Sequence, residues 1–246
     1  MSLNYFIKLA GTCTLVLLMT GCAKTNIQKT SEFDMSGMPK PSAVLIYNFS
    51  IDPQAVQQNS SPLSRIARSF KNDNETVEKL KLGNEVAEAM AKELTEKILA
   101  MGLNPQRADQ NSPIVPGSIL ITGQIVKIDE GNSIRRNVIG FGAGQSSLDA
   151  TISVLAPSSS GNKALITFNA HGDSGEKPGA LVMGPAGAAA GAGAAATAAV
   201  NVAKGAANAY KSASATQAAD IAEKISTELA QYFAKEGWIN SDLAKK

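Results

Sequence analysis

Residues Ser147–Ala170, SLDATISVLAPSSSGNKALITFNA, carry the clearest fold signal in the chain. Over 147–155, apolar and polar side chains alternate with a period of two, which predicts a strand with one buried face and one polar face. A turn rich in proline, serine and glycine follows over 156–162. The next residues, 163–170, are again largely apolar, so we expect the two segments to pair as a β-hairpin.

Two more strands and two helices are predicted outside this hairpin. Apolar residues fill most of 43–49 and 118–128, as they do in buried strands. Helical spacing of apolar residues predicts one helix over 84–101, with Asn84 as its N-cap, and another over 216–236. The apolar positions are Val86, Met90, Leu94 and Ile98 in the first helix and Ala218, Ile221, Ile225, Leu229 and Phe233 in the second.

Together these elements predict an α+β fold. We expect a mostly antiparallel sheet of four or more strands, with both amphipathic helices on one face. The other face is expected to be open to solvent or covered by an Ala/Gly-rich insertion over 180–209.

The N-terminus has the layout of a bacterial export signal. Lys8 precedes a mostly apolar run over 9–20 that is too short to span a membrane. The run ends in Met19-Thr20-Gly21-Cys22, which resembles the lipobox of bacterial lipoproteins. The resemblance implies cleavage between Gly21 and Cys22, a diacylglyceryl group on the Cys22 thiol and a further acyl chain, such as palmitate, on its amine. The alternative is a plain secretory signal with an incidental cysteine.

A lipid at Cys22 would decide where the protein resides. Two or three acyl chains hold a protein firmly on a membrane, whereas one chain binds only marginally. Ala23 stands where an aspartate would signal inner-membrane retention, so resemblance to enteric-type sorting rules favours the outer membrane.

The residues after Cys22 separate the expected lipid from the expected domain. The polar composition of 22–40 predicts an irregular tether, with an ordered edge segment near Phe33 as the alternative. The tether leads to a single domain over 41–240, which we expect to face the periplasm.

Charge and cysteine content argue against several classes of function. Removal of residues 1–21 takes Lys8 from the 23 basic residues and leaves 22 against 21 acidic residues, so nothing favours nucleic acid as a partner. Cys13 is lost with the signal and Cys22 carries lipid, so no thiol remains for a disulfide or a cysteine-ligated metal. We expect no cofactor and no metal site.

Two short motifs could suggest chemistry. Gly140-Phe141-Gly142-Ala143-Gly144 is followed by the predicted strand 147–155, whereas a phosphate-binding loop should lead into a helix. We interpret it as a flexible connection between strands. His171, the only histidine, precedes Gly172-Asp173-Ser174, but a catalytic triad is assembled in space and not from neighbours in sequence. We interpret His171 as a surface or loop residue.

The Ala/Gly-rich segment 180–209 differs in kind from the rest of the chain. Gly187 and Gly191 have the Gly-x-x-x-Gly spacing that lets membrane helices approach closely. We expect an appendage that packs on itself, with self-association or membrane insertion as the alternatives.

The segment 136–149, RNVIGFGAGQSSLD, is similar to a family of bacterial lipoproteins known as domain of unknown function 4410. The residues that carry this motif are Gly140, Phe141, Gly142 and Gly144. The later segment 172–179, GDSGEKPG, and a closing helix before Gly237-Trp238 are also similar to that family. The resemblance implies a small mixed α/β domain on an outer-membrane or periplasmic lipoprotein. It implies no reaction and no catalytic residues.

From these features we expect a non-enzymatic lipoprotein of the outer membrane, a structural or assembly component that binds other proteins or copies of itself. One alternative is a subunit of an envelope pore or secretion channel that uses the Ala/Gly-rich segment. Another is an envelope hydrolase that uses His171.

Overall fold

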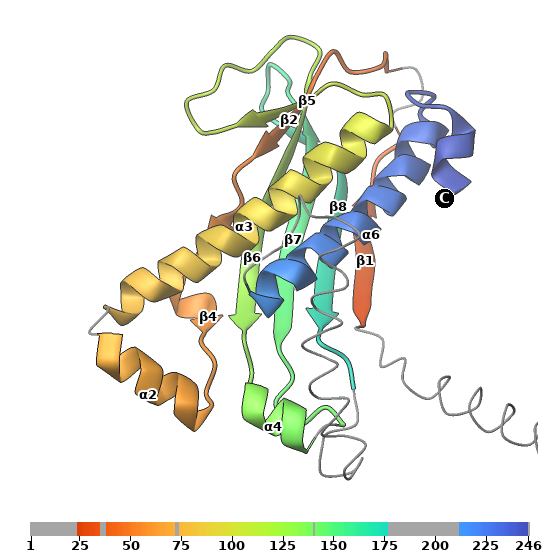
Figure 1. The fold of residues 1–246 in the computed structure, drawn as a ribbon. Coiled ribbons are helices and arrows are strands. Elements are labelled where there is room, and N and C mark those ends of the chain that lie inside the picture. Colours follow the sequence, from red (N-terminus) through yellow and green to blue (C-terminus); the bar gives the residue numbers. More distant parts are fainter. Residues whose placement is uncertain (1–23, 35–37, 72–73, 140, 177–211, 246) are drawn as a thin grey trace, which may run out of the picture. The chain divides into compact units, whose positions relative to one another are not determined.

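The computed structural model describes residues 24–34, 38–71, 74–139, 141–176 and 212–245 (Figure 1). The chain divides into two units. The larger comprises Thr25–Gly131, Ser146–Asp173 and Tyr210–Lys246, and the smaller comprises Met1–Lys24, Asn132–Gln145 and Ser174–Ala209. The predicted export signal, the Ala/Gly-rich segment 180–209 and the site residues Gly21, Cys22, Gly140, Gly187 and Gly191 lie outside the described residues.

The described part of the larger unit is built around an eight-stranded, mostly antiparallel sheet. The strands pair in the order β1-β8-β7-β6-β2-β5, and the short β3 and β4 also pair with β6. β2 is parallel to β5 and β6, whereas β6, β7, β8 and β1 are antiparallel neighbours. The bounds are β1 Thr25–Glu32, β2 Val44–Tyr47, β3 Ser50–Ile51, β4 Val56–Gln57, β5 Pro105–Ala108, β6 Ile119–Asp129, β7 Ser147–Ala156 and β8 Lys163–Asp173. The predicted α+β class is confirmed.

The predicted hairpin is formed by β7 and β8. Their register pairs Ile152 with Phe168, and both side chains are fully buried. Along β7 every second residue is buried, from Leu148 to Ala156, as the alternation in the sequence predicts. One face of the hairpin therefore belongs to the core, and the other points away from it.

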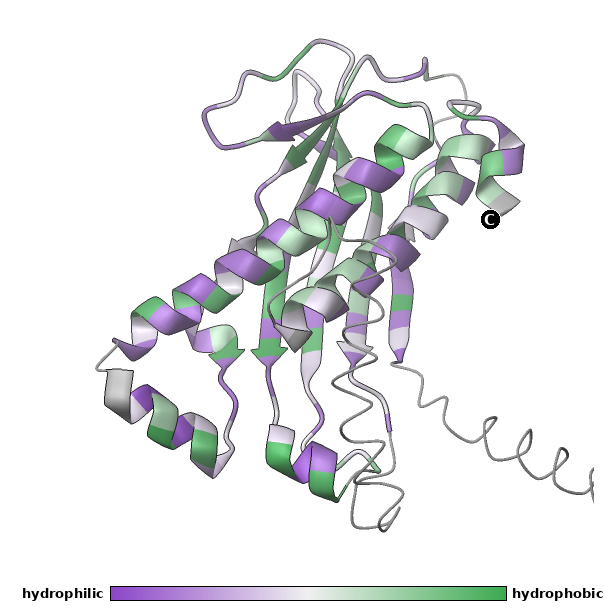
Figure 2. Cartoon of the chain, viewed as in Figure 1, coloured by the Kyte–Doolittle hydropathy of each residue, from purple (hydrophilic) through white to green (hydrophobic). Residues whose placement is uncertain are grey.

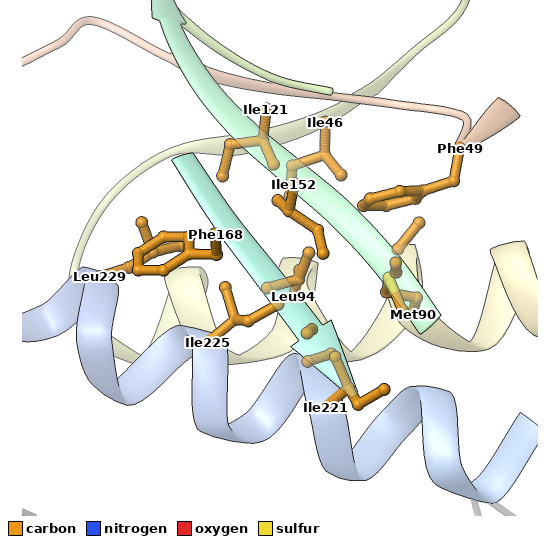
Figure 3. Close-up of a cluster of buried hydrophobic side chains, with 14 of the residues drawn as sticks. Ile46, Phe49, Met90, Leu94, Ile121, Ile152, Phe168, Ile221, Ile225 and Leu229 are labelled. Atoms are coloured by element: carbon orange, nitrogen blue, oxygen red, sulfur yellow. The ribbon is translucent and has the colours of Figure 1, made fainter. Parts of the chain in front are cut away.

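Two long helices, α3 Glu75–Ala100 and α6 Ala213–Lys235, lie side by side over one face of the sheet (Figure 1). Figure 2 shows hydrophobic residues concentrated in β2 and β6. The apolar positions predicted for both helices are fully buried, and they pack with Ile46, Ile121, Ile152 and Phe168 of the sheet (Figure 3). These contacts form the main core.

The start of α3 corrects a prediction. The helix begins at Glu75, and its N-cap is Asn74, whose side chain accepts a hydrogen bond from the Thr76 amide. Asn84 lies inside the helix instead. The preceding Gly83 is an unfavourable residue for a helix, but its missing side chain leaves room for Ile51, which a Cβ would meet at 2.5 Å.

The segment 22–40 also differs from the expected irregular tether, because it contains β1, which ends next to Phe33 and fits the alternative of an ordered edge segment. This edge strand pairs with β8, yet most of its side chains are exposed, so it carries no hydrophobic pattern. Backbone pairing, polar contacts and the packing of Ile27 against the main core hold it in place. Lys224 of α6 donates to the Thr25 carbonyl at 2.7 Å, and Lys235 pairs with Glu32 at 2.8 Å.

Shorter elements complete the described structure. In the larger unit they are α2 Pro62–Lys71 and two 3-10 helices, Pro53–Ala55 and Ser241–Lys245. In the smaller unit, α4 Ser133–Val138 begins after Asn132, whose side chain accepts a hydrogen bond from the Arg135 amide. Within the described residues, no helix has the length and apolar character needed to cross a membrane.

Candidate binding face

The side of the sheet that points away from α3 and α6 is polar over β1, β8, β7 and part of β6. Strand register arranges its side chains in three rows across the strands, which we call the open polar face. The first row holds Asn26, His171 and Asp149, the second holds Gln28, Asn169, Thr151 and Gln124, and the third holds Thr167, Ser153 and Thr122.

Cross-strand hydrogen bonds link side chains within the rows. The Thr151 hydroxyl donates to the Asn169 side-chain oxygen at 3.1 Å. The hydroxyls of Ser153 and Thr167 lie 3.1 Å apart. On the outer strand β1, the amide side chains of Asn26 and Gln28 are exposed to solvent, where a partner could reach them.

A hollow of about 320 Å³ lies on this face. Its polar walls come from the first two rows, and Val126 of β6 supplies its largest apolar side chain. The pairing of β6 with β7 shifts register between Ile125 and Lys127. Val126 lies on the open polar face because it alternates with the buried Ile125, and the bulge that follows keeps Lys127 out of the core as well and returns Ile128 to it.

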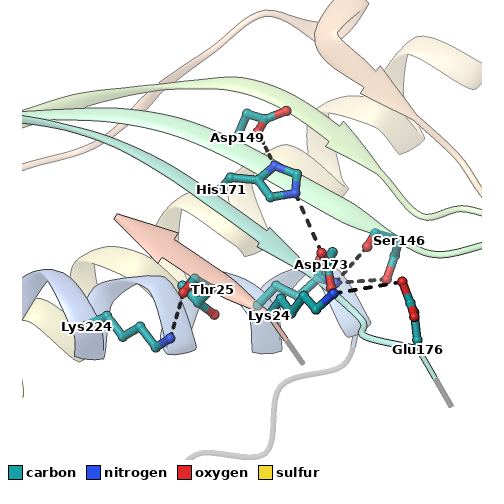
Figure 4. A network of polar contacts seen from close by, with 9 residues as sticks. Lys24, Thr25, Ser146, Asp149, His171, Asp173, Glu176 and Lys224 are labelled. Atoms are coloured by element: carbon teal, nitrogen blue, oxygen red, sulfur yellow. Dashed lines mark hydrogen bonds and ion pairs between the residues drawn. The ribbon is translucent and has the colours of Figure 1, made fainter. Parts of the chain in front are cut away.

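His171 lies between two carboxylates on the open polar face. Its Nδ1 is 2.6 Å from Asp149 Oδ1, and its Nε2 is 3.8 Å from Asp173 Oδ2 (Figure 4). His171 and Asp173 are two positions apart along β8 and so share a face, while Asp149 comes from β7. His171 therefore lies on the surface, as predicted, but within a strand.

Catalysis of the serine-hydrolase type needs a different arrangement. There one imidazole nitrogen faces a carboxylate, and the other takes a proton from the nucleophile. Here both nitrogens of His171 face carboxylates. Among the described residues, no group of three or more His, Cys, Asp or Glu side chains is placed to hold a metal ion.

The same side of the sheet becomes apolar toward β2 and β5. A small buried cluster lies there, separate from the main core, and it consists of Ala43, Leu45, Ala108 and Leu120. Tyr47 and Leu155 pack against this cluster and remain partly exposed. The open polar face is thus bordered by an apolar region.

The glycine motif lies in the smaller unit, in the connection between α4 and β7. Phe141, Gly142 and Gly144 all have positive φ angles, of 49°, 82° and 76°. The Gly144 carbonyl accepts bonds from the amide of Asn132 and the side chain of Arg136. A Cβ on Gly144 would lie 2.5 Å from the Asn132 carbonyl oxygen, so the close turn needs glycine there. The motif closes a loop onto α4, and the sequence predicted the connection but not the helix.

Sequence reasoning missed the neighbours of His171, because strand register brings them together. The alternation within β7 is a signal that could have found Asp149, since it places that residue on the polar side of the strand. The exposed strand β1, which supplies Asn26, has no such signal.

Two long helices on one face of the sheet and polar rows on the other define a two-layer α+β domain with an open polar face. The chain belongs to the family described as Domain of unknown function (DUF4410), whose model matches residues 44–191. The predicted family is therefore confirmed.

Solved structures of PelC from Paraburkholderia phytofirmans are similar to this chain. The PelC L103M dodecamer has 9% sequence identity and a TM-score of 0.37, with 82% of this chain and 94% of that chain covered. The PelC dodecamer in a second crystal form has 8% identity, the same TM-score and the same coverage. No curated protein matches the sequence at a significant level.

Proposed function

We propose that this chain is a non-enzymatic, lipid-anchored component of the bacterial outer membrane that binds other envelope proteins through the open polar face. The observation that supports this proposal is the face itself. Its rows of amide, hydroxyl, imidazole and carboxylate groups lie on an ordered sheet, and the long helices of the described structure cover the opposite side (Figure 1).

The chemistry of the face suits a protein partner. Interfaces between proteins combine hydrogen-bonding groups with apolar contacts. The open polar face supplies the hydrogen-bonding groups. Apolar surface comes from Val126 within the face and from Tyr47 and Leu155 beside it. The helix-covered face, in contrast, has its apolar groups already buried in the core.

The proposed anchor rests on the sequence of the lipobox. Mass spectrometry of the mature N-terminus should find a lipid-modified Cys22, and the Cys22→Ser variant should lose both the modification and membrane fractionation. An unmodified Cys22 in the wild-type protein would contradict the anchor.

Site-specific photo-crosslinking tests the binding face. A photoreactive residue at Asn169 should give crosslinked partners in intact cells, because Asn169 is exposed in the middle of the face. The matched control is Gln231, an exposed residue of α6 on the other layer. Monomer alone at position 169, or equal crosslinking at both positions, would count against binding through this face. A product of twice the monomer mass would identify a second copy as the partner.

A further inference from the structure

Residues 132–145, which we call the α4 loop, expose apolar side chains close together in the sequence. Phe141 is 61% exposed and Ile139 is 44% exposed, and the neighbouring Val138 is also exposed. Single exposed apolar residues are common on soluble proteins, whereas a group of them marks a surface that meets a partner or a membrane.

The backbone at Phe141 supports a role for its ring. Its φ of 49° lies in the left-handed region, which is unfavourable for a bulky side chain. Burial of the ring within the described structure does not offset this cost, because the ring is exposed. A conformation that is strained and also presents an aromatic ring to solvent points to an external contact.

The charge of the α4 loop indicates that this external contact is with a membrane. The sequence of 132–145 contains Arg135 and Arg136 and no acidic residue. Aromatic and aliphatic side chains next to arginines are the combination that binds the interface of an anionic bilayer.

The proposed lipid anchor at Cys22 and the α4 loop are both connected to the same end of the sheet. The register pairs Asp129 with Ser147, Ser147 with Asp173, and Thr25 with Gly172. The strand ends that flank the α4 loop in sequence are therefore at the same end of the sheet as the start of β1. Cys22 precedes Thr25 by three residues, which span at most ~10 Å when extended.

We propose that the α4 loop inserts Ile139 and Phe141 into the headgroup region of the bilayer that holds the Cys22 lipid. This inference rests on the proposed lipid anchor. The anchor and the loop would together fix which end of the sheet faces the membrane, and so how the open polar face is presented.

The mature lipoprotein is suited to a labelling test, because Cys13 is removed and the Cys22 thiol carries lipid. An Asn137→Cys variant then has a single free thiol for an environment-sensitive fluorophore. The full lipidated protein is reconstituted in vesicles of phosphatidylethanolamine and phosphatidylglycerol that contain nitroxide-labelled lipid. The control is Ser159→Cys, in the exposed turn between β7 and β8 at the other end of the sheet.

We expect lipid nitroxide to quench the label at 137 and to shift its emission to the blue, with neither effect at 159. Adding Ile139→Ser and Phe141→Ser to the Asn137→Cys variant should abolish both effects, while circular dichroism stays unchanged. Equal quenching at 137 and 159 would overturn the proposal. So would a label at 137 that is shielded from aqueous iodide but not quenched by lipid nitroxide, since a protein contact would then cover the loop. Mass spectrometry of Cys22 on the same sample reports separately on the anchor.

Discussion

Gly123 of β6 is a single residue on which the packing of the sheet depends. A Cβ at this position would lie 2.7 Å from the Thr151 carbonyl oxygen and would also overlap the Phe49 ring. Only a hydrogen fits between the ring on one side and the neighbouring strand on the other. The requirement is steric, because the backbone of Gly123 has no positive φ.

We expect Gly123→Ala to lower the free energy of unfolding by about 1–3 kcal/mol, since overpacking forces the ring or the strand to move. Urea denaturation measures this change. Thr122→Ala, at the preceding position of β6, is the control and should change stability by about 0.5 kcal/mol or less. Equal effects of the two substitutions would contradict the steric argument.

Asp220 of α6 leads to a prediction about pH. Burial, with added repulsion from Glu223 and Glu93, raises the pKa of Asp220 above its usual value. The folded state thus binds this proton more tightly than the unfolded state, and the ionised carboxylate opposes folding at neutral pH. Asp220→Asn should therefore raise the free energy of unfolding at pH 7, and the gain should vanish as the pH falls below the pKa of Asp220 in the unfolded chain.

Glu32 of β1 provides the opposite case. Hydrogen bonds from Lys235 and Lys29 lower the pKa of Glu32, so its stabilising contribution is present at pH 7 and is lost as the pH falls through that lowered pKa. Glu32→Gln should lower stability at pH 7 by at most about 1 kcal/mol, because the pair is close to solvent. Urea denaturation of both variants at pH 7 and pH 3 checks these predictions. At pH 7 the free energy of unfolding should rise for Asp220→Asn and fall for Glu32→Gln. A stabilising Glu32→Gln at pH 7 would contradict the ion-pair assignment.

Two secondary-structure elements, α3 and β1, extend beyond what apolar patterns predict. The first turns of α3 are solvent-exposed, with Val77 and Leu80 both on the surface. In the edge strand β1, Ile27 packs against the main core while most other side chains are exposed. Exposed segments bury little apolar surface, so hydrophobic periodicity does not mark where they begin or end.

The two asparagines of α3 test where the helix begins. Asn74→Ala should cost about 1 kcal/mol, because it removes the acceptor for the Thr76 amide. Asn84→Ala should be neutral or slightly stabilising, because alanine has the higher helix propensity inside a helix. Thermal unfolding followed by circular dichroism compares the stability of the two variants. A larger loss of stability for Asn84→Ala than for Asn74→Ala would indicate that Asn84 is the N-cap.

Across the larger unit, the two sides of the sheet carry different kinds of side chain. The side under α3 and α6 holds the main core, and the other side holds the open polar face. Substitutions on the two sides should therefore have different consequences, since one set creates cavities and the other removes surface groups.

Ile225→Ala should lower the free energy of unfolding by about 2–5 kcal/mol, because Ile225 is fully buried between α6 and the sheet. Asn169→Ala should change stability by about 0.5 kcal/mol or less but reduce crosslinking to the partner from a photoreactive residue at its neighbour Gln28. Urea denaturation and crosslinking from position 28 are measured for both the Ile225→Ala and the Asn169→Ala variants. A strongly destabilised Asn169→Ala would show that the polar rows serve the fold.

The α+β class, the β7–β8 hairpin, the buried faces of both long helices and the family could all be predicted from the amino-acid sequence. These features are local or periodic: alternation in 147–155 and helical spacing from Val86 to Ile98 follow directly from which side chains must leave water. The folded arrangement alone showed where β1 pairs in the sheet, where α3 begins, and that Asn26 and Asp149 lie opposite His171. Periodicity within one segment shows which of its side chains share a face. It does not show which residues of a distant segment lie opposite them, because that pairing is made by backbone hydrogen bonds between the two segments.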